Sequence, residues 1–103
     1  MTTFSFVYRS CDESNVTFYF RHNRVMTKSE IVTITYDHVN EAFNQVYFYN
    51  RRYIKQLDGS YRQDDSCYMQ TDGQCRPTHE RFKVSASKDF TDQLEAVAIP
   101  YFT

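Results

Sequence analysis

Cysteine and histidine are the residue types in this chain that could bind a metal ion, and it holds three of each. Cys67, Cys75 and His79 lie close together in the stretch CYMQTDGQCRPTH. Seven residues separate the two cysteines, whereas structural zinc sites place about two to four residues between paired cysteines, and Cys11 or His22 would have to supply a distant fourth ligand. The spacing therefore predicts no metal site, and no motif indicates a cofactor.

A disulfide between Cys67 and Cys75 depends on the register of the turn between them. A two-residue Asp-Gly turn would leave Cys67 too far along its strand to meet Cys75, whereas a five-residue loop from residue 69 to 73 would bring the two face to face. Because we expect the protein in a reducing compartment, we expect free cysteines.

Catalytic motifs are missing from the sequence. Cys11 could pair with His22 or His38 as nucleophile and base, but any cysteine and histidine in a small chain can be paired on paper. Two glycines cannot supply a phosphate-binding loop or a dinucleotide fingerprint. Asp64 and Asp65 could bind a hard cation, although adjacent carboxylates in a polar loop are usually solvated. We therefore expect that the protein is not an enzyme.

The length and composition predict one compact domain spanning residues 1–103. Hydrophobic residues make up 41% of the chain and the net charge is -1, which is not the composition of a disordered chain. Leu57 and Leu94 are the only leucines, beside nine phenylalanines and nine tyrosines. The core is therefore expected to be aromatic and β-branched, with several tyrosine hydroxyls at the surface.

The net charge also argues against two classes of protein. A near-neutral chain lacks the strongly basic face of a protein that binds duplex DNA through its phosphates, and it is not an acidic nucleic-acid mimic. The amino terminus MTTFSFVYRS does not have the pattern of a signal peptide, and no later run is long enough to span a membrane. We expect a cytoplasmic protein, in the host cell cytoplasm if a phage encodes it.

Three segments, TTFSFVY, VTFYFR and IVTITY, have the alternating pattern of strands with one buried face. In the first, Phe4, Phe6 and Tyr8 share one side, and the first two segments are expected to pair as a hairpin. The third, at about residues 30–36, follows a capping-box match in TKSE, but its β-branched side chains favour a strand. The inner face of the resulting sheet is predicted to carry Phe4, Phe6, Phe18 and Phe20.

A helix of roughly twenty residues is predicted after the third strand. Asp37 can cap it, Gly59 can end it, and the apolar side chains between them follow one line at about 100° per residue. The fold class is therefore expected to be α+β, with a small antiparallel sheet packed against one long helix. The stripe consists of Val39, Phe43, Val46, Asn50, Tyr53, Ile54 and Leu57.

The competing interpretation of residues 45–57 is a pair of strands, with VYFY in one and an Asp-Gly hairpin in QLDGSY. A continuous strand would place Val46, Phe48, Asn50 and Arg52 on one face, mixing apolar and charged groups. The helix gives a coherent stripe and is the interpretation we favour. Asn50 in the middle of that stripe would then need hydrogen-bond partners.

The rest of the chain predicts a second hairpin and a short C-terminal helix. A turn at QTDGQ leads to an expected strand in ERFKVSA, and Phe90, Leu94 and Val97 have helical spacing up to Pro100. The last residues, AIPYF, are apolar, and we expect them to pack on the sheet. The alternative is that they contact a partner or a second copy of the chain.

On the helical interpretation Phe48 points away from the core and is surrounded by cations. Aromatic side chains next to cations suit protein hot spots and also suit base stacking with phosphate contact. The alternative is that Phe48 packs beneath the later hairpin while the cations are solvated. The candidate partner-binding residues are Phe48, Tyr49, Arg51, Arg52, Lys55 and, from the second strand, Tyr19.

The sequence favours a non-enzymatic protein-binding module that docks on a larger protein partner and inhibits or modulates it. Many inhibitors encoded by phages and mobile elements, anti-CRISPR proteins among them, are single small domains without catalytic motifs, so an inhibitor of host defence is expected by analogy. The alternative is a single-stranded nucleic-acid-binding module, with bases stacked on the aromatics and phosphates bound by Arg51, Arg52 and Lys55. The sequence does not distinguish a monomer from a homodimer.

Overall fold

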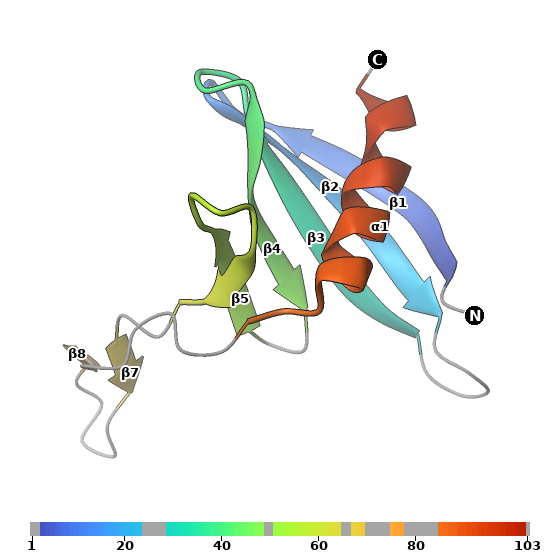
Figure 1. The fold of residues 1–103 in the computed structure, drawn as a ribbon. Coiled ribbons are helices and arrows are strands. Elements are labelled where there is room, and N and C mark those ends of the chain that lie inside the picture. Colours follow the sequence, from blue (N-terminus) through green and yellow to red (C-terminus); the bar gives the residue numbers. More distant parts are fainter. Residues whose placement is uncertain are drawn as a thin grey trace.

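An antiparallel sheet of six strands, crossed by one helix, forms the main body of this computed structural model (Figure 1). The structure describes residues 3–23, 29–48, 51–64, 67–69, 75–77 and 85–102. Neighbours in the sheet are also neighbours in the chain, in the order β1-β2-β3-β4-β5-β6. The strands are β1 (Thr3–Cys11), β2 (Asn15–Asn23), β3 (Ser29–Asp37), β4 (Ala42–Phe48), β5 (Arg51–Lys55) and β6 (Tyr61–Gln63).

The first three strands form where the sequence alternates. Along β2 the more buried side chains alternate with more exposed ones, because successive residues of a strand point to opposite faces. Phe18 lies opposite Ile34 of β3, and both are fully buried. The three predicted strands and the hairpin of β1 with β2 are confirmed. Phe20 is buried as predicted, and Phe4 and Phe6 pack against the same core while partly exposed.

The long helix predicted to begin at Asp37 is wrong. The chain instead forms β4 and β5, which pair antiparallel. The register of this pair, and not an alternation continued from β4, sets which residues of β5 face the core. Val46 and Tyr53 lie opposite each other and are buried, whereas Arg52 is exposed on the other face. The mixed face that argued against a strand does not arise, because that argument assumed one continuous strand.

Asp37 caps a tight turn instead of a helix. Its Oδ2 accepts a hydrogen bond from the side-chain amide of Asn40 at 2.6 Å, and its Oδ1 accepts one from the backbone N–H of Val39 at 2.8 Å. The bond from Asn40 is the main cause that lowers the pKa of Asp37. Glu41 completes the turn with a φ of 54°, and β4 begins at the next residue.

The turn between β5 and β6 is the Asp-Gly hairpin of the competing interpretation. Asp58 Oδ1 accepts hydrogen bonds from the backbone N–H and the hydroxyl of Ser60, at 2.9 and 2.7 Å. The N–H of Gly59 donates to the carbonyl oxygen of Gln56 at 3.0 Å. Gly59 has a φ of 88°, in a region that glycine adopts readily. It therefore permits a turn and does not end a helix.

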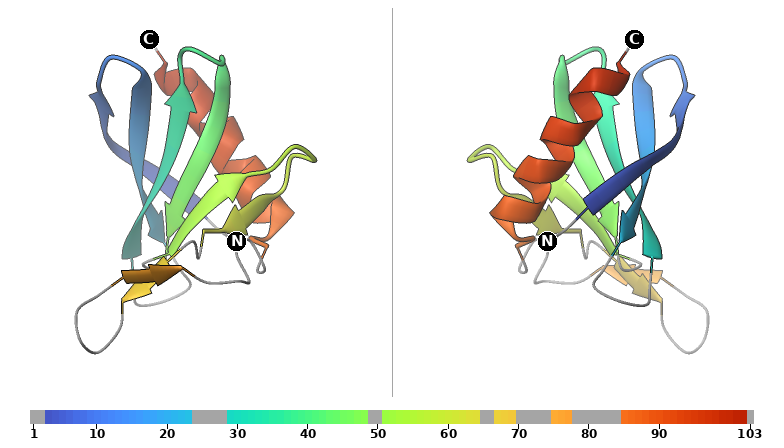
Figure 2. Two further views of the ribbon diagram at one scale, coloured as in Figure 1. Left: turned by 90° about the vertical axis from the view of Figure 1, so that its left-hand side faces the viewer. Right: turned by 90° about the vertical axis from the view of Figure 1, so that its right-hand side faces the viewer.

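The helix α1 (Lys88–Ala98) lies across one face of the curved sheet and continues into the 3-10 turn η1 (Ile99–Tyr101) (Figure 2). Ser87 caps its start by accepting a hydrogen bond from the backbone N–H of Phe90 at 3.4 Å. Leu94 is fully buried. The predicted short C-terminal helix is confirmed, and it is this helix that covers the sheet.

The apolar C-terminal residues pack on the sheet, as expected. Tyr101 stacks on Phe6 with ring centroids 4.0 Å apart, and Phe102 packs against Phe18 with centroids 5.3 Å apart. Arg9 of β1 fixes this segment, because its Nη1 donates to the carbonyl oxygens of both Tyr101 and Phe102 at 2.7 Å.

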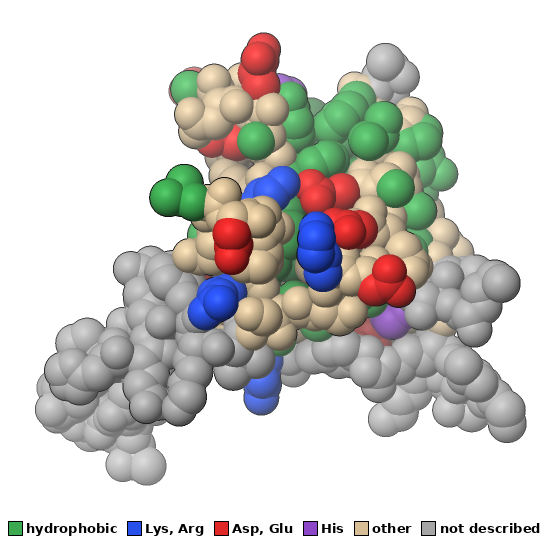
Figure 3. Space-filling view, viewed as in Figure 1, with side chains coloured by type: hydrophobic (Ala, Val, Ile, Leu, Met, Phe, Trp, Pro, Cys, Tyr) green, Lys and Arg blue, Asp and Glu red, His purple; other side chains and the backbone are tan. Residues whose placement is uncertain are grey.

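The face of the molecule that carries α1 has two chemical halves. Figure 3 shows hydrophobic side chains gathered around the C-terminal end of α1, and charged side chains of both signs around β5 and the start of the helix. One charge pair joins Lys55 of β5 to Glu95 of α1 at 3.1 Å. In the part of the chain that the structure describes, no helix has both the length and the apolar character needed to cross a membrane.

The hairpin predicted around QTDGQ corresponds to a separate two-stranded sheet, β7 (Cys67–Met69) and β8 (Cys75–Pro77). Cys67 lies opposite Pro77, and Cys75 opposite Met69. The register that would place the two cysteines face to face is therefore not formed. The side chains of both cysteines, and most of the strand predicted in ERFKVSA, lie outside the described residues.

Candidate functional site

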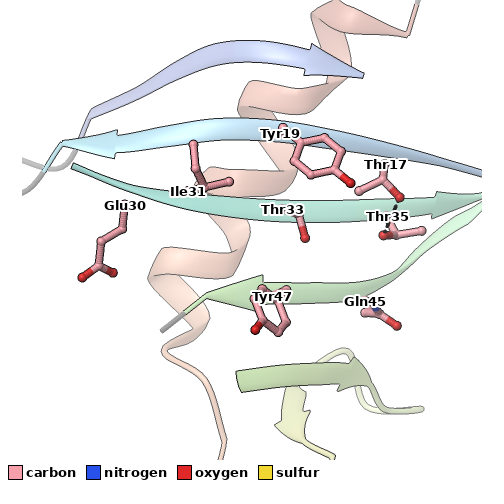
Figure 4. A pocket seen from close by; sticks show the side chains of 8 residues that line it. All are labelled: Thr17, Tyr19, Glu30, Ile31, Thr33, Thr35, Gln45 and Tyr47. Atoms are coloured by element: carbon pink, nitrogen blue, oxygen red, sulfur yellow. Dashed lines mark hydrogen bonds between the residues drawn. The ribbon is translucent and has the colours of Figure 1, made fainter. Parts of the chain in front are cut away.

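One row of side chains crosses five strands on the sheet face opposite α1, and Figure 4 shows three of its members, Tyr19, Thr33 and Tyr47. Cross-strand pairing joins Tyr8 to Tyr19, Tyr19 to Thr33, Thr33 to Tyr47, and Tyr47 to Arg52. We call these five residues the tyrosine row. Tyr8 is 50% exposed and Tyr47 is 40% exposed, so much of the row is open to solvent.

A β-bulge at Val7 brings Tyr8 into the row. Phe6 pairs with Phe20 and Tyr8 pairs with Tyr19, and these two partners are consecutive in β2. Val7 is therefore the extra residue that moves Tyr8 to the face opposite Phe6. Tyr8 does not share a face with Phe6, contrary to the prediction from simple alternation.

A shallow groove of about 850 Å³ runs along this face beside the tyrosine row. Its walls offer hydroxyl groups, one amide, tyrosine rings and one carboxylate, so they can donate and accept hydrogen bonds while stacking on flat groups. The hydroxyls of Thr17 and Thr35 lie 3.1 Å apart and share a hydrogen bond across β2 and β3. The lining residues are Thr17, Tyr19, Glu30, Ile31, Thr33, Thr35, Gln45 and Tyr47.

Tyr8 and Tyr19 form a rigid pair at one end of the tyrosine row. Their rings stack with centroids 4.2 Å apart and an interplanar angle of 8°. A hydrogen bond with Tyr8, followed by burial, raises the pKa of Tyr19.

Arg52 supplies the positive charge of the tyrosine row. Its Nη2 forms an ion pair with Asp64 Oδ2 at 2.9 Å, and the Arg52 side chain is 51% exposed while that of Asp64 is 6% exposed. The pair holds the guanidinium in place at the outer surface. Among the described residues that line the groove, Glu30 is the single charged one, so they bring no excess of positive charge.

The residues predicted for partner binding do not form one surface. Phe48 is 8% exposed and stacks on Tyr53 at 4.7 Å, so of the two alternatives the structure has the packed one. Lys55 points toward α1, where it pairs with Glu95. Tyr19 and Arg52 do share the outer face, in the tyrosine row.

Two further predicted residues have different outcomes. Arg51 is exposed, and its Nη1 donates to Oε1 of Gln63 at 3.2 Å. By strand alternation it belongs to the opposite face from Arg52. Tyr49 lies outside the described residues.

Sequence analysis missed Tyr8, Ile31 and Tyr47 as surface residues of one site. Alternation in its strand directs Ile31 to the outer face, so the sequence held a usable signal for this residue. Its side chain is 46% exposed. Tyr47 falls within the segment predicted as a helix, and Tyr8 is predicted to share a side with Phe4 and Phe6. Alternation along the sequence reveals neither the hairpin that positions Tyr47 nor the bulge that positions Tyr8, and both errors follow from this.

The groups that line this site can donate and accept hydrogen bonds and stack on flat groups. Within the described residues, no group of three or more histidine, cysteine, aspartate and glutamate side chains is placed to hold a metal ion. Comparison of the chain with protein-family models, with curated proteins and with solved structures gives no match.

Proposed function

We propose that the protein is a small non-enzymatic binding module that docks on a larger protein partner through the tyrosine row and its groove, and inhibits or modulates that partner. The observation that carries the proposal is the row of three tyrosines, one threonine and one arginine across five strands, in which Tyr8, Tyr47 and Arg52 are exposed. Tyrosine and arginine are the residue types, with tryptophan, that dominate binding energy at protein interfaces.

The sheet supports docking because it holds these side chains before a partner arrives. Tyrosine loses little conformational entropy when it is immobilised, and the stacking of Tyr8 on Tyr19 already fixes two of the rings. Arg52 is likewise oriented by Asp64. A preorganised surface of this kind keeps more of its contact energy as affinity.

The biological class that we propose is an inhibitor carried by a phage or mobile element and directed against a host defence protein, in the manner of anti-CRISPR proteins. This part rests on analogy with small single-domain inhibitors and on the lack of catalytic motifs in the sequence. The docking surface and its test do not depend on it.

Affinity capture from host lysate, with and without nuclease, tests the docking surface. Tyr47→Asp and Ile31→Asp place a charge in the exposed face without disturbing the core, and Leu57→Asp is the matched control because Leu57 is fully exposed in the β5–β6 turn. We expect one protein to be captured at fixed stoichiometry by wild type and by Leu57→Asp, in both halves of the lysate. Capture that survives Tyr47→Asp and Ile31→Asp in a folded variant would refute this surface.

A second candidate function is binding of single-stranded nucleic acid. It is favoured by one observation, since tyrosines exposed on an antiparallel sheet beside an arginine are the arrangement on which sheet domains stack unpaired bases. Glu30 in the groove opposes it by repelling phosphates. Fluorescence anisotropy with labelled oligo-dT and oligo-U tests this second function. It predicts an affinity that falls steeply with salt and is lost in Arg52→Glu.

A further inference from the structure

A second pocket is lined by residues of β1, β2, β3, the β3–β4 turn and the C-terminal segment. Figure 2 shows the β1–β2 turn, the β3–β4 turn and the C-terminus at the same end of the sheet. Its volume is about 340 Å³, which is in the range of small-ligand sites. Val16 and Tyr36 place it on the face that α1 covers, so it is separate from the tyrosine row. The lining residues are Arg9, Cys11, Val16, Tyr36, His38 and Phe102.

Arg9 gives this pocket an oriented positive charge. Its Nη1 donates to the carbonyl oxygens of Tyr101 and Phe102, both at 2.7 Å, which fixes the plane of the guanidinium. Those carbonyls are neutral, and no carboxylate of the described residues pairs with Arg9. A guanidinium has five N–H donors, so others remain for an anion, and a carboxylate matches their geometry.

The remaining walls are flat and largely apolar. Tyr36 and Phe102 pack with ring centroids 4.8 Å apart at 59°, and Phe102 remains 37% exposed. The His38 ring meets that of Tyr36 edge-on, with centroids 5.7 Å apart. A ligand that covered these rings would remove apolar surface from water, which favours binding.

Two nearby carboxylates limit the charge that a ligand can carry. Asp12 and Asp37 lie in the two turns beside the pocket, which are joined by a hydrogen bond from the backbone N–H of His38 to the carbonyl oxygen of Ser14 at 2.8 Å. Neither lines the pocket, and both accept hydrogen bonds within their own turns. They would repel a second anionic group at the His38 end of the pocket while leaving the Arg9 end unaffected.

We propose that this pocket binds a small aromatic monocarboxylate, with its carboxylate on the guanidinium of Arg9 and its ring against Tyr36 and Phe102. The site is independent of the proposed docking function, because it uses the other face of the sheet. Cys11 lines the pocket and is exposed, so its thiol can report whether the pocket is occupied.

Protection of Cys11 from iodoacetamide tests the proposal. The full chain carrying Cys67→Ser and Cys75→Ser leaves Cys11 as the single thiol, and the two probes are 2-naphthoate and 2-naphthalenemethanol, which share a ring system and differ in charge. We expect 2-naphthoate to slow alkylation, at a half-protecting concentration about tenfold lower than that of the alcohol, because a charged hydrogen bond is added. Equal protection by the two probes, or none by either, would overturn the proposal.

Two variants test whether the carboxylate of the ligand binds to Arg9. Arg9→Gln should remove the difference between the two probes, whereas Lys88→Gln, which removes an exposed cation at the start of α1, should keep it. A difference that persists in Arg9→Gln would contradict the assignment of the carboxylate to Arg9. Because Arg9 also fixes the C-terminal residues, circular dichroism must first show that Arg9→Gln is folded, and if it is not, the comparison of probes on the parent chain decides.

Discussion

A single extra residue, Val7, decides which face of the sheet Tyr8 occupies. Without the bulge, alternation would place Tyr8 beside Phe6 on the core side, and the tyrosine row would lose its first ring. With the bulge, Tyr8 stacks on Tyr19 and contributes an exposed aromatic surface. Bulges that re-aim a side chain are common next to functional sites, which agrees with the role proposed for this face.

We expect the buried phenol of Tyr61 to make the folded protein less stable at alkaline pH. Burial, and then the negative charge of Glu95, raises the pKa of its phenol, and the hydroxyl has no hydrogen-bond partner of acceptable geometry among the described residues. The unfolded chain ionises near a pH of about 10, so stability is constant below that value and falls as the pH rises through it. We expect Tyr61→Phe to be as stable as wild type or more stable at neutral pH, and to lose less stability above pH of about 10.

Urea unfolding at neutral and alkaline pH measures this effect, with Tyr101→Phe as the control because Tyr101 is exposed. An equal alkaline loss of stability in Tyr61→Phe and wild type would show that the buried phenol is not responsible.

The proposed docking site could be predicted from the sequence only in part. Tyr19 follows from the alternation of its strand, which sends it outward between Phe18 and Phe20. Tyr47 and Arg52 become neighbours through the register of β4 with β5, and register depends on long-range pairing that alternation within one strand does not specify.

At the scale of elements, the helix predicted across residues 37–58 and the observed hairpin bury some of the same residues. Val46 and Tyr53 are seven residues apart, which places them on one face of a helix, and they are also direct partners between β4 and β5. The apolar spacing therefore fits both structures. Local preference was the better guide, because β-branched and aromatic residues fit a pleated surface.

The alternation of β1, β2 and β3 was sufficient to predict those strands, because each is long and has one buried face. The β5–β6 hairpin has its own local signal in Asp58 and Gly59. The helix α1 was predictable from the spacing of Phe90, Leu94 and Val97, but its role as the cover of the sheet was not. That role depends on which other segment occupies the core.

Phe48→Ala distinguishes the hairpin from the helix experimentally. Phe48 packs on Tyr53 and on Phe90 of α1, with centroids 4.7 Å apart in both cases. We expect the substitution to lower the free energy of unfolding by about 3–5 kcal/mol, as for other buried phenylalanines. The control Leu57→Ala should change it by less than about 0.5 kcal/mol, because Leu57 is fully exposed.

Urea denaturation gives both values, and Phe48→Leu keeps the fold measurable if Phe48→Ala is too unstable. A small loss of stability in both variants of Phe48 would mean that this side chain is exposed and that the pairing of β4 with β5 is wrong.

Gly59→Ala tests the β5–β6 turn. A Cβ at this position would meet no atom within 4 Å, so the cost comes from the positive φ of the backbone alone. We expect a loss of about 1 kcal/mol in the free energy of unfolding. Gly59→Asn should lose less, since asparagine tolerates this region better, and equal stability of all three chains would contradict the turn.

At the scale of the whole molecule, α1 covers one face of the six-stranded sheet, so the two faces of that sheet carry different groups. The covered face holds the aromatic core and, at its end, the pocket that contains Arg9. The opposite face carries the tyrosine row and its groove. A net charge of -1 gives little long-range steering, so the proposed docking would depend on contacts at short range.

Photo-crosslinking from the tyrosine row tests the central claim most directly. Tyr47 is replaced by p-benzoylphenylalanine, which keeps an aromatic ring at an exposed position, and Leu57 is replaced in the same way as the control. After irradiation in host lysate, we predict one adduct of defined mass from position 47, resistant to nuclease and sensitive to protease, and no such adduct from position 57. If position 47 gives no protein adduct, or the same adducts as position 57, the outer sheet face is not a protein-docking surface.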